Sequence, residues 1–176
     1  MSLTAYEISI PVMVRGLNVL QDYLGHAEAL GAGRPDGVGG VLETRLAPDM
    51  LNFADQIRVV CNKAERHAAH LAGKDNPPEA NAPATAPALK ARLAQAILYL
   101  ESLPEEAIVG AEARTYQLSN PLVRGWFGGS DYILQLVLPD FFFHLTTAHD
   151  ILRHLGAPIG KRDYLGRLGI ESGGYS

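Results

Sequence analysis

The sequence has one cysteine, few charged residues, no long hydrophobic run and no surplus of positive charge. With Cys61 as its single cysteine, the 176-residue chain has no internal disulfide and no CxxC metal or redox motif. One unpaired thiol is typical of a reducing environment, so we expect a cytoplasmic location. The 15 Lys and Arg residues against 19 Asp and Glu residues give a net charge of −4 at pH 7. We therefore expect no nucleic-acid partner, because binding to a phosphate backbone needs a basic face.

The most apolar stretch, residues 132–143, is interrupted by Pro139 and Asp140. It falls well short of the roughly 20 apolar residues that span a bilayer, so we expect no membrane partner. Charged residues make up 19% of the chain and hydrophobic residues 47%. A charged fraction below the usual ~25%, in a chain this apolar, excludes disorder and indicates buried or shared apolar surface.

Apolar residues at steps of three and four predict a long first helix over residues 3–27. Thr4 and Glu7 fit a capping box at its start, in which each side chain bonds the backbone amide of the other. Pro11 either kinks this helix or marks its true first turn. The glycine-rich residues 31–40 are expected to be a flexible connection, because no strand precedes them as a phosphate-binding loop requires.

The same periodicity predicts two further helices before Pro104. The second begins at Pro48 and Asp49, which suit a first turn, and ends near Gly73. Residues 74–87 form a Pro/Ala/Asn-rich linker without periodicity, which predicts an extended crossing on the surface. Thr85 caps a third helix that stops before Pro104.

The last third of the chain predicts a short hairpin and a fourth helix. The helical pattern lapses between Ile108 and Phe127, where a hairpin with a break at Asn120–Pro121 fits the residues. Ser130 or Asp131 caps the fourth helix, which runs to Leu155 and is apolar around much of its circumference. Such a helix is buried on several sides, by the other helices or by a partner chain.

The predicted fold is therefore all-α. It is a single-domain four-helix bundle over residues 1–176 with a long crossover loop and a short β-hairpin before the last helix. Residues 166–176 are expected to form a flexible tail.

Residues 138–166 and 45–57 resemble a bacterial domain-of-unknown-function family within the DinB-like (DinB/YfiT) superfamily of four-helix bundles. The first segment is the more specific, because its Pro-x-x-x-x-His run, Leu-Arg-His-x-Gly helix end and Gly-Lys-x-Asp-Tyr-Leu tail occur in one order. The resemblance implies the bundle fold. The superfamily includes metal-dependent enzymes and thiol-dependent transferases, which typically place one His of the second helix and a His-x-x-x-His pair of the last around a divalent metal.

This sequence departs from that metal-binding pattern. His144 and His149 are five residues apart, which places them roughly 140° apart around an α-helix, whereas a shared metal needs a spacing of four. Ala148 stands where the partner of His144 is implied, and Gln56 aligns with the ligand of the second helix. An amide is a poor ligand for zinc or nickel, so we expect no metal cofactor. The alternative is a zinc or nickel site in which His144 uses non-standard ligands.

His144 is the histidine with the strongest case for an inward position. Either it is a core polar group held by Asp140, Gln56 or Thr147, or it acts in binding or proton transfer. On the second helix, residues 49, 56 and 63 repeat at seven and share one face, which either points inward toward His144 or is solvated. The candidate pocket residues are Asp49, Gln56, Asp140, His144 and Thr147.

Two other groups have simpler interpretations. His67 and His70 lie near the end of the second helix and are expected to be solvated surface residues. Cys61 lies on the apolar stripe of that helix, where a thiol packs as a small hydrophobe with a raised pKa. No GxSxG or SxxK motif supports nucleophilic catalysis.

Two hypotheses of function remain. The first is a homodimeric bundle protein, without a complete metal triad, that binds a small molecule or has a structural role. The second is a divalent-metal-dependent enzyme of the thiol-transferase type that uses His144. The unused apolar surface of the fourth helix favours the first, and the resemblance alone favours the second.

Overall fold

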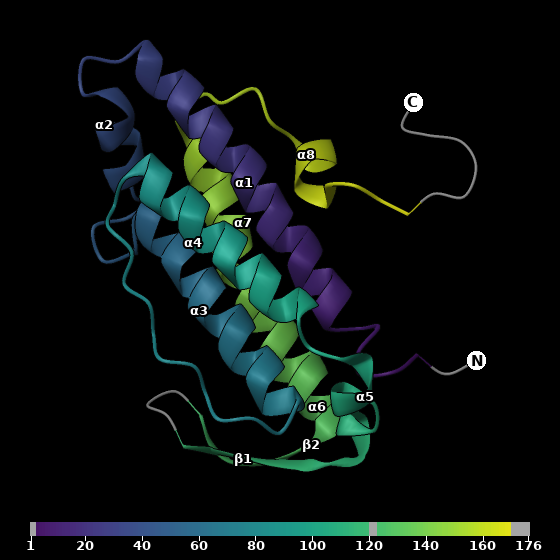
Figure 1. Ribbon diagram of the computed structural model, residues 1–176. Helices are drawn as coiled ribbons and strands as arrows, with labels where there is room; N and C mark the ends of the chain where they lie inside the picture. The colour runs from purple at the N-terminus through teal and green to yellow at the C-terminus, as the bar shows by residue number, and fades with distance from the viewer. Residues whose placement is uncertain (1–2, 120–122, 170–176) are drawn as a thin grey trace.

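Four long helices form a bundle in the computed structural model, which describes residues 3–119 and 123–169 (Figure 1). These helices are α1 (Ile10–Ala32), α3 (Phe53–Leu71), α4 (Ala86–Glu101) and α7 (Leu138–His154). α1 and α3 each pack against both α4 and α7, so the four helices enclose one apolar core. The predicted all-α bundle is confirmed.

The order of the helices in the bundle depends on a long crossover. Residues 72–85 run back along the length of α3, so α3 and α4 point in the same direction (Figure 1). Two contacts hold the crossover to α3: Ala80 donates its amide to Asn62 Oδ1 at 3.3 Å, and Arg66 pairs with Glu79. The predicted crossover loop is therefore fixed at its middle by polar contacts.

Short elements close the two ends of the bundle. The hairpin lies at one end, with β1 (Thr115–Ser119) and β2 (Arg124–Gly128) antiparallel and Tyr116 opposite Phe127. This confirms the predicted hairpin, while the predicted break at Asn120–Pro121 lies outside the described residues. The other short helices are α2 (Gly37–Glu43), α5 (Glu105–Ile108), α6 (Gly129–Asp131) and α8 (Lys161–Leu165), with a 3-10 turn at Ala111–Ala113.

The first helix begins later than its apolar stripe predicts. The Thr4–Glu7 capping box is present, with Thr4 N to Glu7 Oε2 at 2.8 Å and Glu7 N to Thr4 Oγ1 at 3.2 Å. It stabilises a run of turns, however, and α1 starts at Ile10 with Pro11 in its first turn. The second of the two interpretations of Pro11 is correct, because a proline lacks only an amide that the first turn would leave unpaired.

Two predicted boundaries near the second long helix are wrong. Residues 31–40 are not a loop throughout, because α2 begins at Gly37 and buries Val41 and Leu42. Its approach to α1 requires glycine at 31, where a Cβ would lie 2.5 Å from the Val38 backbone. α3 begins at Phe53 and not at Pro48, because Asn52 caps it by accepting the Asp55 amide at 2.8 Å.

The fourth long helix contains a wider segment that the sequence pattern did not predict. Gly128 precedes the helical run, so neither Ser130 nor Asp131 is its N-cap, and residues 132–137 are π-helical before α7 begins at Leu138. Pro139 gives the physical reason, since it lacks an amide and its ring clashes with the carbonyl four residues earlier. Leu134 and Phe143 are 58% and 60% exposed, so part of the apolar circumference of this helix is not covered by the other helices of the chain.

One buried ion pair joins the two parallel helices. Arg92 on α4 donates to both carboxylate oxygens of Glu65 on α3 at 2.7 and 2.6 Å, and to Asn62 Oδ1 at 2.8 Å. A bidentate pair fixes both the distance and the rotation of two helices that share a direction. None of the helices in the described parts of the chain has the length and apolar character needed to cross a bilayer. Residues 170–176 of the predicted tail lie outside those parts.

A pair of glycine substitutions in α1 tests the closeness of its contact with α7. A Cβ at Gly16 would lie 2.5 and 2.7 Å from ring atoms of the fully buried Phe141, whereas a Cβ at Gly25 meets nothing within 4 Å. Gly16→Ala should therefore destabilise the protein by about 1–2 kcal/mol through overpacking. Gly25→Ala should stabilise it by about 0.5–1 kcal/mol, because alanine favours the helix. Urea denaturation measures the change in the free energy of unfolding for both variants. If both substitutions changed it in the same direction, the close contact of Gly16 with Phe141 would be contradicted.

Candidate functional site

A chain of polar side chains runs along the contact between α3 and α7, and we call it the α3–α7 polar cluster. The α3 members are spaced by seven, four and three residues, which places them on one helical face. The cluster consists of Gln56, Lys63, His67 and His70 on α3, Tyr132 in the π-helical segment, and Asp140 and His144 on α7.

Asp140 is the charged centre of the cluster. Lys63 Nζ donates to Asp140 Oδ2 at 2.5 Å, and His67 Nε2 lies 3.5 Å from the same oxygen with no closer partner in the residues described. Burial raises the pKa of Asp140, but His67 and Lys63 outweigh it and hold the pKa at about 2. Asp140 is therefore a carboxylate at every physiological pH.

His144 is held in one tautomer by Gln56. The Gln56 amide donates through Nε2 to the Leu51 carbonyl at 3.2 Å, so its Oε1 is the atom that accepts from His144 Nδ1 at 2.8 Å. Burial and the Lys63 charge lower the pKa of His144, and Asp140 opposes them only in part. The imidazole is thus neutral near pH 7, with its proton on Nδ1 and a lone pair on Nε2.

This lone pair lies beside the Asp140 carboxylate and not in a bond to it. His144 Nε2 is 3.8 Å from Asp140 Oδ1, and both atoms are acceptors in this tautomer. The side chains of His144 and Asp140 are 12% and 21% exposed, and that of Lys63 is 28% exposed. Solvent therefore reaches a group of two acceptors and one ammonium donor.

The cluster continues toward the hairpin through Tyr132. Its hydroxyl lies 2.8 Å from His67 Nδ1 and 3.0 Å from His70 Nδ1. One hydroxyl proton can serve only one of these nitrogens, so the other histidine must donate its own Nδ1 proton. Burial raises the pKa of Tyr132, and burial followed by His67 lowers the pKa of His70. The Tyr116 ring on β1 stacks on Tyr132 at 4.7 Å between centroids and closes this end.

Three of the five predicted pocket residues come together, and two do not. Gln56, Asp140 and His144 are neighbours within the cluster. Thr147 instead donates to the Phe143 carbonyl of its own helix at 2.8 Å. Asp49 lies exposed in the turn before α3, because that helix begins at Phe53 and not at Pro48 as predicted.

The other histidines of the region are also placed. His149 lies on the far side of α7, where its Nδ1 is 2.5 Å from the Tyr23 hydroxyl of α1, so it cannot share a ligand with His144. His67 is 7% exposed and bonded to Tyr132, so the expected solvated surface position is wrong. The thiol of Cys61 is buried, which raises its pKa to about 12 as predicted.

Sequence reasoning missed three members of the cluster, His67, His70 and Tyr132, although a signal was present for the two histidines. The repeat of seven that links Gln56 to Lys63 continues by four to His67 and by three to His70. The positions 56, 63, 67 and 70 therefore form one stripe. The small and charged residues around the two histidines, however, are typical of a surface position and hide this pattern. Tyr132 gave no such signal, since the π-helical segment determines where its hydroxyl lies.

The donor set of the α3–α7 polar cluster differs from the metal-binding pattern that the resemblance implies. No group of three or more His, Cys, Asp or Glu side chains suited to a metal ion is found in residues 3–119 and 123–169. Gln56 and Ala148 stand at the positions where the superfamily pattern implies histidines, and Gln56 Oε1 already accepts from His144. The Lys63 ammonium occupies the Asp140 carboxylate, where it would repel a second cation.

The acid stability of the protein should depend on Asp140. Its pKa is depressed in the folded state, so its stabilisation is complete above the unfolded value near 4 and is lost as the pH falls through about 2. Asp140→Asn should lower the free energy of unfolding by up to about 2 kcal/mol at neutral pH. The difference in free energy of unfolding between the variant and the wild-type protein should disappear between pH 4 and pH 2. Urea denaturation across this range measures this difference. The exposed Asp49→Asn is the matched control, and a difference that stays constant to pH 2 would contradict the ion pairing.

Comparison with known proteins places the chain in a family. A crystal structure of a protein described as a DinB family member from Shewanella denitrificans is 30% identical and superposes with a TM-score of 0.85, with 96% of this chain and 95% of that chain covered. No curated protein matches the chain. The model of the family described as a domain of unknown function, DUF1993, matches residues 5–165. The chain therefore belongs to the DUF1993 family, within the DinB-like four-helix bundles.

Proposed function

We propose that this protein binds a small molecule at the α3–α7 polar cluster and that it does so without a divalent metal. The observation that carries the proposal is the fixed tautomer of His144. Gln56 holds the Nδ1 proton, which leaves the Nε2 lone pair beside the carboxylate of Asp140. Two acceptors that face each other at 3.8 Å without a hydrogen between them are suited to a ligand that brings the hydrogen.

The charges of the cluster indicate the class of ligand. A hydroxyl or thiol donates its hydrogen to His144 Nε2, and its oxygen or sulfur accepts from the Lys63 ammonium. Lys63 uses one donor on Asp140 in the structure, and an ammonium has three. The Lys63 ammonium, held by Asp140, thus supplies the positive charge that a metal supplies in the metal-binding members of the superfamily. The ligand we propose is therefore a small alcohol or thiol.

NMR of the isotope-labelled protein, purified without a histidine tag, tests the proposal. The His144 imidazole should show the Nδ1-protonated tautomer at pH 7. Adding 2-mercaptoethanol or ethylene glycol should shift its Nε2 resonance in a saturable way, whereas 1,2-dimethoxyethane, which has no donor, should not. Zinc and nickel should neither bind in stoichiometric amount nor raise the Tm of the protein.

Matched variants separate this site from a general solvent effect. His144→Gln should abolish the response, and His149→Gln should leave it intact because His149 faces α1. Lys63→Met removes the ammonium from Asp140 and should increase the affinity for zinc. If the wild-type protein instead holds stoichiometric metal that His144→Gln releases, the alternative of a divalent-metal enzyme of the thiol-transferase type is supported and our proposal is wrong.

We also propose that the protein is a homodimer. The apolar ring of Phe143 lies beside the Gln56–His144 pair and packs edge-on against His144 at 5.2 Å between centroids. Leu51, whose backbone carbonyl accepts from Gln56, is a second apolar residue of this region. Phe143 and Leu51 are 60% and 40% exposed, and apolar surface next to a half-buried site is suited to cover by a second copy.

Light scattering after size exclusion tests the dimer. The wild-type protein at micromolar concentration should have twice the 19.0 kDa mass of the chain, and Phe143→Ser should shift it toward the monomer. Leu98→Ser is the matched control, because Leu98 is 65% exposed on α4, away from the α3–α7 contact. A monomer for the wild-type protein would contradict the proposal.

A further inference from the structure

Residues of α1 and of the chain that follows α8 line a hollow on the surface of the bundle. Figure 1 shows α8 beside α1 and away from α3. The hollow has a volume of about 450 Å³ and lies between the outer face of α1 and the chain that follows α8. An adjoining hollow of about 700 Å³ shares Asp22, Gly166 and Arg167 with it and extends toward His26 and Lys90. The two together form an open groove along α1.

The groove is a built feature of the fold, because α8 is bonded to α7 and the chain just after α8 lies against α1. The Tyr164 hydroxyl bonds to Thr146 at 2.9 Å, and its ring packs edge-on against His149. Gly166 then crosses α1 with a φ of +66°, and a Cβ there would lie 2.8 Å from Val19 Cγ2. Only glycine allows both this conformation and this approach, so the contact of the chain with α1 just before Arg167 depends on Gly166.

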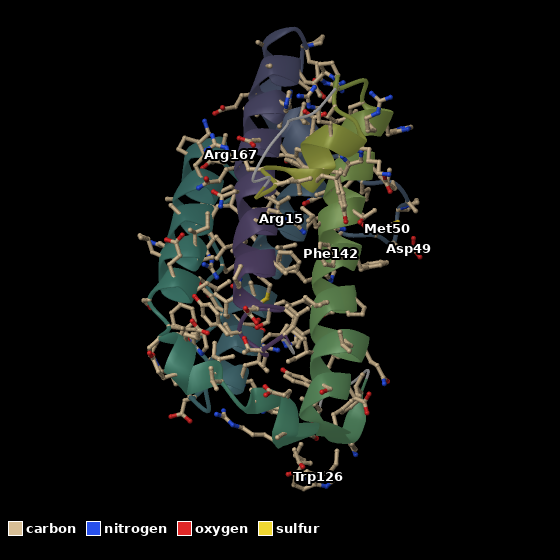
Figure 2. The ribbon with its side chains drawn as sticks, turned by 90° about the vertical axis from the view of Figure 1, so that its right-hand side faces the viewer. Arg15, Asp49, Met50, Trp126, Phe142 and Arg167 are labelled. Atoms are coloured by element: carbon tan, nitrogen blue, oxygen red, sulfur yellow. The ribbon has the colours of Figure 1, made fainter. Side chains whose placement is uncertain are left out.

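Two guanidinium groups flank the smaller hollow. Arg15 comes from α1 and Arg167 follows α8, and Figure 2 shows both on the face that carries α8. Within the parts of the chain that the structure describes, neither side chain has a carboxylate within 4.0 Å. Asp22 is the one acidic residue in the lining, and it forms no ion pair with them. The hollow therefore has a surplus of positive charge that nothing described here neutralises.

The remaining lining divides into an apolar and a polar part. Pro11, Val14 and Val19 supply an apolar wall, and Asn18 and Gln21 supply amides near the arginines. A guanidinium pair binds a carboxylate or a phosphate through paired N–H donors, while an apolar wall beside it binds a short hydrocarbon chain. The hollow is large enough for a head group with a short chain, and too open for a wholly apolar ligand.

We infer that this groove is a binding site for a small amphiphilic anion. The carboxylate or phosphate head lies between Arg15 and Arg167, and the hydrocarbon chain lies on Pro11, Val14 and Val19. The site is separate from the α3–α7 polar cluster and does not rest on the function proposed for that cluster.

Isothermal titration with four probes of equal chain length tests the inference. Hexanoate and hexyl phosphate should bind saturably, and whichever binds more tightly identifies the head group. Hexan-1-ol and hexylamine should bind at least about tenfold more weakly, because they cannot pair with two guanidinium groups. Affinity for the anions should fall as sodium chloride is added, since the arginines are partly exposed.

Variants assign the binding to the groove. Arg167→Gln, at an exposed position, and Arg15→Gln should each weaken hexanoate binding by about tenfold, the loss of one charge-assisted hydrogen bond. Arg124→Gln, at an exposed arginine on the hairpin, is the matched control and should bind hexanoate like the wild-type protein. Val14→Asn should weaken hexanoate but leave acetate unchanged.

Three results would overturn the inference. These are the absence of saturable anion binding, anion binding that is unchanged in both Arg15→Gln and Arg167→Gln, and equal binding of hexan-1-ol and hexanoate. If inorganic phosphate binds as tightly as hexyl phosphate, the apolar wall plays no part and the assignment of an amphiphile is wrong.

Discussion

The register of α7 against α3 is the constraint on which the candidate site depends. The two helices are antiparallel, so Gln56 meets His144 and, further along, Lys63 meets Asp140. Sliding one helix by a turn, about 5.4 Å, would break both contacts together. Each would leave a half-buried polar group without its partner, and such a group costs about 1–3 kcal/mol. The same bonds therefore hold the bundle in register and define the tautomer of His144.

Helix existence and order follow from the sequence, because four apolar stripes and the proline-rich linker depend only on local spacing and composition. The boundaries of the helices depend also on tertiary packing. Pro48 and Asp49 suit a first turn, but α3 starts at Phe53, where Asn52 caps it and Phe53 packs into the core. The glycines of residues 31–40 read as a loop, but α2 forms there because Val41 and Leu42 find a buried position against the rest of the bundle. Tertiary packing overrides local preference at both places.

In the candidate site too, local spacing predicts some features of the structure, whereas others depend on contacts between distant parts of the chain. The five-residue step from His144 to His149 predicts that the two face different ways, and they bond to α3 and to α1. His67 and His70 looked like surface residues because their sequence neighbours are small and charged. Both contact Tyr132, which follows His67 by 65 residues and His70 by 62 residues in the chain. No local sequence pattern indicates a contact between residues so far apart. Because Gln56 on the same stripe has a buried amide, the other polar residues of the stripe are better interpreted as members of the same α3–α7 polar cluster.

The π-helical segment has a consequence for the phase of the last long helix. Tyr132 and Asp140 are eight residues apart, which in a regular α-helix leaves their side chains about 80° out of line. The wider turns of residues 132–137 advance each residue by less than the usual 100°, which reduces this offset. Tyr132 and Asp140 can then both meet His67. The π-helical segment thus extends the α3–α7 polar cluster from the middle of the bundle to the hairpin. A regular α-helix at residues 132–137 would separate Tyr132 from Asp140 and divide the cluster into two parts.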